Sequence, residues 1–146
     1  MFIFNHLCGV ILIIKGRGIA PGKGSGQLLV SPAPISFLSG VDPESGIIVE
    51  TGHPLRGECM AGKVLAFPYG KGSTVGSYVL YALSRNGHAP AAIINAEAEP
   101  IIATGAIIAE IPMIDRIDVP FDRLRNGTCV TVDGDHGEME YDGNPI

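Results

Sequence analysis

Apolar residues along the chain fall into short runs, and glycine or proline separates most of these runs from one another. Short runs rich in valine, isoleucine and leucine are typical of buried β-strands. The pattern predicts strands near residues 11–15, 27–30, 64–67, 91–95, 111–114, 128–132 and 138–141. It also predicts two helices, at residues 74–85 and 100–109. Asn86-Gly87 is a stop signal after the first helix, and Pro100 suits the first turn of the second.

The order strand, helix, strand, helix, strand over residues 64–114 is typical of a βαβαβ unit with parallel strands. Further β segments flank this unit on both sides, and residues 133–137 form a predicted hairpin loop. The expected fold class is therefore α/β, in a single domain over residues 10–146.

Residues 1–9 are expected to form a poorly ordered N-terminal extension, or to derive from a start codon placed too early. The apolar stretch at residues 1–14 is shorter than the roughly 20 residues that a membrane-spanning helix needs. It also lacks the basic region and the cleavage site of a signal peptide. We therefore expect no membrane association.

Composition narrows the function further. A chain of 146 residues, 46% of them apolar, is long enough for one domain with a real core. A net charge of −5 without a long basic run argues against nucleic acid as a partner. The mean hydropathy of +0.30 is high for an isolated domain, which indicates that some apolar surface faces another subunit. Cys8, Cys59 and Cys129 are widely spaced, which favours thiols in the reducing cytoplasm over ligands of a cluster.

The strongest candidate site is the glycine-rich turn between the strand at residues 64–67 and the helix at 74–85. Such a turn directs unpaired backbone N–H groups and the positive end of the helix dipole at its occupant. A phosphate, a carboxylate or an ionised hydroxyl is stabilised there. The alternative is a purely structural turn, in which Ser73 or Thr74 caps the helix and Lys71 is solvated. A simple cap does not require three glycines, whereas the close approach of another surface does; the glycines are Gly70, Gly72 and Gly76.

Several known motifs do not match. A Walker A loop needs serine or threonine directly after Gly-Lys, but Gly72 follows Lys71. The G-x-S-x-G nucleophile elbow fits neither Ser73 nor Ser77. A dinucleotide fingerprint beginning at Gly16 fails because proline stands at position 21. The sequence therefore indicates neither a nucleotide-binding loop nor a serine hydrolase.

The remaining polar residues leave alternatives open. His53 lies in a polar turn, either on the surface or in contact with a ligand or partner. His88 resembles in part the histidine of phosphohistidine swivel domains, from which Pro90 departs. Asp133 and the acidic residues after it lack the spacing of a calcium loop, which favours a solvated hairpin tip.

An ordered set of segments over residues 11–141 resembles the small, swivelling subunit of aconitase X. The segments are Lys15-Gly16-Arg17, Gly46-Ile47-Ile48-Val49, Gly52-His53-Pro54-Leu55, Gly62-Lys63-Val64-Leu65, the turn from Gly70 to Leu80, Asn95, Glu99-Pro100-Ile101 and the Asp133-Gly134 hairpin. The resemblance implies a swivelling β/β/α domain, as in the aconitase small domain. It also implies a two-subunit hydro-lyase, a dehydratase, that is inactive without its large subunit.

The resemblance implies further chemistry. A [4Fe-4S] cluster on the large catalytic subunit would act as Lewis acid, and the swivel subunit would close over the substrate with a serine base, here Ser73. In archaea the substrate of this family is (R)-5-phosphomevalonate, which is converted to trans-anhydromevalonate 5-phosphate in the mevalonate pathway of isoprenoid biosynthesis. The partners implied are thus the large subunit of a heterodimer and a phosphorylated hydroxy acid.

Ordinary aconitases have Gly-Ser-Ser-Arg at this turn, and the arginine grips a substrate carboxylate; here Val75 replaces that arginine. Anion binding is therefore expected to depend on Lys71, on the backbone at Gly72 and Thr74, and on Arg17. Two alternatives remain. A related aconitase X subunit dehydrates cis-3-hydroxyproline with the same serine, and a phosphohistidine-type mobile carrier would depend on His88 instead.

Overall fold

The computed structural model describes residues 2–6 and 9–142. Its elements are β1 (Phe2–His6), β2 (Gly9–Lys15), β3 (Arg17–Ala20), β4 (Lys23–Val30), β5 (Ile35–Ser36), β6 (Val64–Phe67), β7 (Gly70–Lys71), α1 (Gly76–Arg85), β8 (Ala92–Asn95), α2 (Pro100–Ile108), β9 (Met113–Asp115), the 3-10 helix η1 (Phe121–Arg123), β10 (Cys129–Asp133) and β11 (Glu138–Asp142). No helix in this part of the chain is long and apolar enough to cross a membrane.

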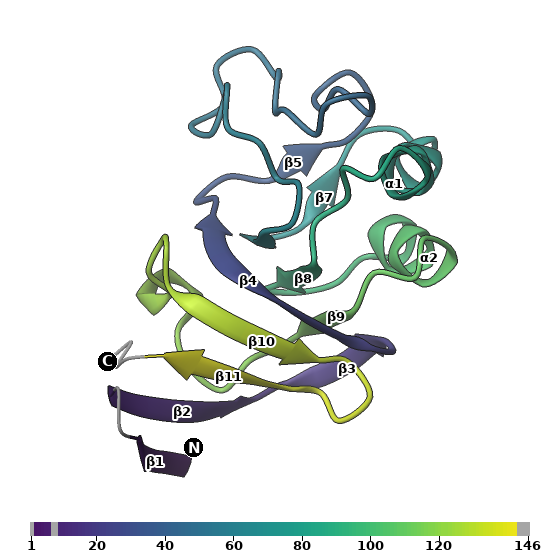
Figure 1. Cartoon of the computed structure of the whole chain (residues 1–146). Coiled ribbons are helices and arrows are strands. Elements are labelled where there is room, and N and C mark those ends of the chain that lie inside the picture. Colours follow the sequence, from purple (N-terminus) through teal and green to yellow (C-terminus); the bar gives the residue numbers. More distant parts are fainter. Residues whose placement is uncertain (1, 7–8, 143–146) are drawn as a thin grey trace.

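Strand β4 joins two sheet layers. Its first five residues pair antiparallel with β10 (Lys23↔Asp133), and its last three residues pair in parallel with β6 (Leu28↔Val64). The strand order is β1-β2-β11-β10-β4-β6-β8-β9-β3. The strands before β4 in this order are antiparallel, and β4, β6, β8 and β9 are parallel. Helices α1 and α2 lie on the far side of the parallel layer (Figure 1). The fold is the expected β/β/α swivel architecture.

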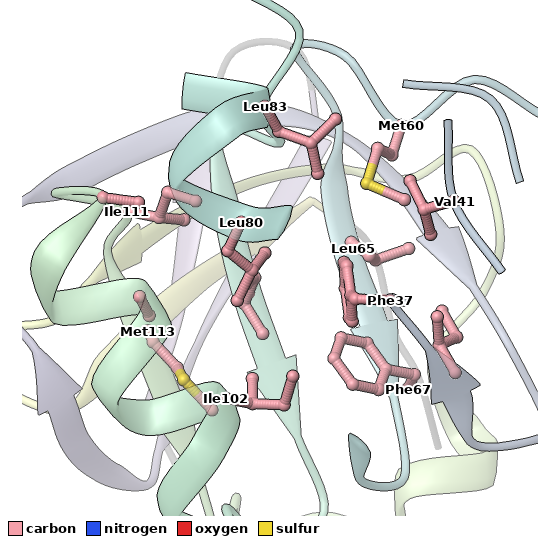
Figure 2. Packing of buried hydrophobic residues seen from close by; sticks show 14 of the residues in the cluster. Phe37, Val41, Met60, Leu65, Phe67, Leu80, Leu83, Ile102, Ile111 and Met113 are labelled. Carbon is pink, nitrogen blue, oxygen red and sulfur yellow. The ribbon is translucent and has the colours of Figure 1, made fainter. Parts of the chain in front are cut away.

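Two apolar cores separate the three layers, because successive side chains of a strand point to opposite faces. In β6, Val64 and Ala66 belong to the core between the sheets, whereas Leu65 and Phe67 belong to the core under the helices. A strand buried on both faces has a continuous apolar run, which is the pattern that predicted β6 and β8. In the helix-side core, the rings of Phe37 and Phe67 pack with their centroids 5.8 Å apart (Figure 2).

Residues 37–63 form an irregular segment between β5 and β6, closed by the isolated bridges Val41↔Ile48 and Ile47↔Cys59. Its buried apolar side chains, among them Val41 and Met60, pack into the helix-side core (Figure 2). Strand β5 at the start of this region pairs in parallel with β7. The segment is therefore held against the glycine-rich turn.

The observed elements differ from the predicted ones in several places. Helix α1 begins at Gly76 and not at Thr74, because residues 73–75 form a turn in which Gly76 N–H bonds to the Ser73 carbonyl. The short strands β3, β5 and β7 were not predicted, and β9 covers only Met113–Asp115. Residues 2–6, which the sequence analysis assigned to a poorly ordered extension, form β1 and pair antiparallel with β2. Gly9, the last residue of the expected extension, is the first residue of β2. Residues 1, 7 and 8 lie outside the described residues.

Candidate functional site

The glycine-rich turn lies against the protein's own β5 and α2. The β5–β7 ladder pairs Ser36 with Lys71. Gly72 has φ +94°, and a Cβ there would lie 2.9 Å from Ser36 Oγ. A Cβ at Gly70 would collide with the side chain of Ile102 in α2. At these two positions the glycines therefore permit close approach within the chain itself, where the sequence analysis expected another surface.

Ser73 is exposed at the entrance of α1, and its Oγ accepts a hydrogen bond from the Val75 N–H at 3.1 Å. Val75 is the N-cap residue of α1, and it makes no side-chain capping bond. Helix α2 differs, because the Glu99 carboxylate accepts from the N–H groups of Ile101 and Ile102 at 2.9 and 2.7 Å. Neither Ser73 nor Thr74 is therefore the N-cap residue of α1, and this part of the structural alternative is wrong.

A small cleft of about 120 Å³ opens beside this turn. Its lining residues come from the turn, from α1 and α2 and from the residue after β5: Phe37, Gly70, Lys71, Gly72, Ser73, Gly76, Glu99, Ile101 and Ile102. Pockets that enclose a whole drug-sized ligand usually measure about 300–1,000 Å³. The cleft is therefore large enough for only part of a phosphorylated metabolite.

Lys71 is exposed and forms an ion pair. Its Nζ lies 2.9 Å from Glu50 Oε2, and the other oxygen of that carboxylate accepts the Ser36 backbone N–H at 3.0 Å. Partial burial raises the pKa of Glu50, but the hydrogen bonds from Lys71 and Ser36 and the charge of Lys71 outweigh burial and lower it overall. Sequence reasoning missed Glu50, because nothing in its local pattern indicates a partner on a later strand.

Arg17 and Thr74 are not among the residues that line the cleft. The Arg17 guanidinium donates two hydrogen bonds to the completely buried carboxylate of Asp115, at 2.9 and 2.7 Å. The bond to Asp115 raises the pKa of Arg17. Thr74 is exposed, and its carbonyl accepts from Ser77 Oγ at 3.1 Å. The contact of Arg17 with substrate stays a prediction.

The remaining polar candidates, His53, His88 and the hairpin at Asp133, are wholly or partly buried in the chain itself. His53 is buried: its Nδ1 accepts the Leu55 N–H at 3.0 Å, so Nε2 carries the proton and donates to the Pro34 carbonyl at 3.1 Å. The expected surface position of His53 is therefore wrong, and its contact with a ligand or partner stays a prediction. His88 Nδ1 is buried without a hydrogen-bond partner. The predicted solvated hairpin tip is in part buried: Asp133 is buried, and Gly134 and Gly137 pack on residues 16–22.

The described residues do not fit an iron–sulfur cluster, whose irons need thiolate ligands. Cys59 donates its S–H to the Ser45 carbonyl, and Cys129 is exposed on β10. Within residues 2–6 and 9–142 no group of three or more histidine, cysteine or acidic side chains is placed to hold a metal ion. Cys8 lies outside the described residues.

The fold and the turn define a swivel domain of three layers, with a serine, a paired lysine and an uncapped helix N-terminus around a small cleft. The family model "Aconitase X swivel domain" matches residues 13–141. The chain belongs to this family.

Solved and curated relatives agree with this assignment. The structure resembles the holo-form of Thermococcus kodakaraensis aconitase X with a TM-score of 0.85 and 55% identity, covering 89% of this chain and 98% of that one. The phosphomevalonate dehydratase small subunit of Thermococcus kodakarensis is 57% identical over 87% of this chain and 94% of its own length. The protein of that name from Methanosarcina acetivorans is 55% identical over 87% and 89%, respectively.

Proposed function

We propose that this chain is the small subunit of a hydro-lyase that dehydrates (R)-5-phosphomevalonate to trans-anhydromevalonate 5-phosphate in the cytoplasm. The relatives named phosphomevalonate dehydratase small subunit support the substrate, since each aligns with most of this chain and with most of its own length. The family assignment also favours a dehydratase over the phosphohistidine-type carrier.

Ser73 is the proposed base. Its Oγ, as alkoxide, takes the proton from the carbon next to the substrate carboxylate, a carbon–carbon double bond forms, and the β-hydroxyl leaves as water with one further proton. The observation that carries this proposal is the bond from Val75 N–H to Ser73 Oγ at the uncapped start of α1. An N–H donor and the positive helix end stabilise negative charge on that oxygen.

Lys71 and the backbone at Gly72 and Thr74 are the proposed binding groups for a substrate anion. Lys71 and Gly72 line the cleft beside Ser73, and Thr74 is the next residue of the turn. Arg17 is the one remaining proposed group; it does not line the cleft, and its guanidinium bonds to Asp115. A single ammonium together with backbone N–H groups suits a phosphate or carboxylate oxygen.

The rest of the site is proposed to come from a large subunit that also carries the [4Fe-4S] cluster. Two observations support a second subunit. The cleft is too small for the whole substrate, and the described cysteines do not form a cluster site. The words "small subunit" in the relatives' names point the same way.

The test is anaerobic coexpression with the large subunit and an assay of water loss from (R)-5-phosphomevalonate and from cis-3-hydroxyproline. We expect turnover of the first substrate, and a loss of at least about 10²-fold in kcat for Ser73→Ala, the usual contribution of a general base. Ser77→Ala is the matched control, a serine on the first turn of α1 whose Oγ bonds to the Thr74 carbonyl.

Size-exclusion chromatography of both variants checks that the complex still assembles. Normal turnover by an assembled Ser73→Ala complex would disprove the assignment of the base. Turnover of cis-3-hydroxyproline alone would disprove the assignment of the substrate.

A further inference from the structure

Glu50 holds the cation of the cleft through an arrangement that involves both of its oxygens. Oε2 lies 2.9 Å from Lys71 Nζ, and Oε1 accepts the Ser36 N–H at 3.0 Å. Ser36 is also the partner of Lys71 in the β5–β7 ladder. A single carboxylate therefore bonds to both members of one cross-strand pair, directly beside the turn that carries Ser73.

The backbone of Glu50 is held in place by hydrogen bonds to Gly40. The N–H groups of Val49 and Glu50 both donate to the Gly40 carbonyl, at 2.9 and 3.1 Å. A Cβ at Gly40 would lie 3.0 Å from Glu50 Oε1, so a side chain there would crowd the carboxylate. The Glu50 side chain is 18% exposed and that of Lys71 is 47% exposed. The anion is thus the more buried member of the pair, held by its own backbone, and the cation is the more exposed member.

We propose that Glu50 is a positioning residue, which holds the Lys71 ammonium over the cleft so that it meets a carboxylate or phosphate oxygen of the substrate. This inference rests on the function proposed above. Fixing a free lysine side chain costs rotamer entropy. A lysine that is already oriented binds an anion with a smaller entropic loss. An ammonium has three donors, and the bond to Glu50 leaves two of them for the substrate.

Stabilisation of the fold is a poor alternative explanation for this pair. An ion pair with one half-exposed lysine contributes little to stability in most proteins, because water screens the charges and two long side chains must be ordered. The net lowering of the Glu50 pKa keeps the carboxylate ionised at neutral pH, as an acceptor for the ammonium must be. Glu50 belongs to the irregular segment 37–63, and its partner Lys71 lines the cleft. Glu50 can therefore orient a cation of the cleft without lining the cleft itself.

A double-mutant cycle in the assembled two-subunit enzyme tests the inference. With (R)-5-phosphomevalonate, we expect Glu50→Gln to lower kcat/KM by about 10- to 100-fold, the range in which misplaced binding groups act. In a Lys71→Met background the same change should have less than about a twofold effect, because a residue that acts through Lys71 has nothing left to position. An equal loss in both backgrounds, or no loss in either, overturns the inference.

Glu58→Gln is the matched control, an exposed glutamate on the same irregular segment, and it should leave kcat/KM unchanged. The charge-reversed double variant Glu50→Lys with Lys71→Glu restores opposite charges at the two positions. We expect it to unfold at the same temperature as the natural protein and to remain inactive. Recovery of activity in this variant would mean that the pair matters only as an ion pair, and would overturn the inference.

A second measurement needs no turnover, so it separates this inference from the proposed function. Acylation of lysines by an amine-reactive ester, followed by peptide mass spectrometry, reports the reactivity of each ammonium. We expect Lys71 to react several-fold faster in Glu50→Gln than in the unmodified complex, with Lys63 as the unchanged internal reference. If the natural complex fails to dehydrate phosphomevalonate, the proposed function is wrong. If Lys71 reacts at the same rate in both proteins, the role of Glu50 is wrong.

Discussion

The backbone of Gly70 lies directly against the side chain of Ile102: a Cβ at position 70 would be 2.8 Å from Ile102 Cδ1 and 3.0 Å from Glu99 Oε1. Ile102 is buried in the helix-side core and cannot move aside freely (Figure 2). This contact fixes the distance between the glycine-rich turn and the first turn of α2. The shape of the cleft therefore depends on the absence of a side chain at position 70.

Gly70→Ala is expected to destabilise the protein by about 1–3 kcal/mol, the usual cost of an extra methyl group in a packed core. Urea unfolding followed by circular dichroism measures this change. The matched control is Gly76→Ala in the same turn, where a Cβ would meet only ordinary contacts at 3.7 Å from Phe37 and 3.8 Å from Ile101. There we expect unchanged or slightly increased stability, because alanine favours the helix over glycine by up to about 1 kcal/mol. Equal destabilisation by both substitutions would contradict the close contact at Gly70.

Asp115→Asn is expected to lower the free energy of unfolding by about 1–3 kcal/mol, because a buried acceptor of several bonds loses its charge. Asp115 is completely buried and accepts from Arg17 twice and from the Ala98 N–H at 2.7 Å. An asparagine in its place presents an NH₂ group to at least one of these donors. Thermal unfolding of the purified chain measures the change.

The control for Asp115 is the neighbouring pair of Arg116 with Glu97, whose side chains are 54% and 62% exposed. Glu97→Gln should leave the unfolding temperature unchanged, since water solvates both members of this pair. If Glu97→Gln destabilised the protein as much as Asp115→Asn, burial would not explain the cost at Asp115.

The hairpin between β10 and β11 is expected to lose stability in acid. Burial raises the pKa of Asp133, but hydrogen bonds from the His136 ring and backbone and the charges of His136 and Lys23 outweigh burial and lower it overall. A carboxyl with a lowered folded pKa stabilises the protein fully above its unfolded pKa, about 3.9, and this contribution disappears as the pH falls through the folded pKa. Asp133→Asn should therefore flatten the fall of the unfolding temperature between about pH 5 and pH 2. Parallel pH profiles for the two proteins would contradict this assignment.

The sequence pattern was sufficient for the strands that are buried on both faces. β6 and β8 were predicted because a strand packed between two cores has a continuous apolar run, which is visible without knowing its neighbours. The strands β3, β5 and β7 were not predictable in this way. They contain glycine or only two residues, and they exist because distant partners pair with them, as Asp115 does with Arg17 and Lys71 with Ser36.

In the candidate site, too, some residues could be predicted from the sequence and others could not. The glycines, Lys71 and Ser73 are consecutive in the chain, so their spacing before a helix was enough to single out the turn. Glu50 and Ile102 are far from the turn in the sequence, and no local pattern marks either residue as its neighbour. The role of Arg17 also depends on a distant residue, because Asp115 engages a cation that the sequence alone would leave free for a ligand.

The sequence by itself determined the α/β class, the strands of the parallel layer, the turn that carries Ser73 and the resemblance to the aconitase X swivel subunit. These properties follow from neighbouring residues, through apolar periodicity and backbone chemistry. Only the tertiary structure decided that Lys71 is paired with Glu50, that α1 begins without a capping side chain, and that a cleft of about 120 Å³ opens beside the turn. Ion pairs, caps and cavities depend on which distant segments meet, and the packing of β5, α1 and α2 around the two cores settles that.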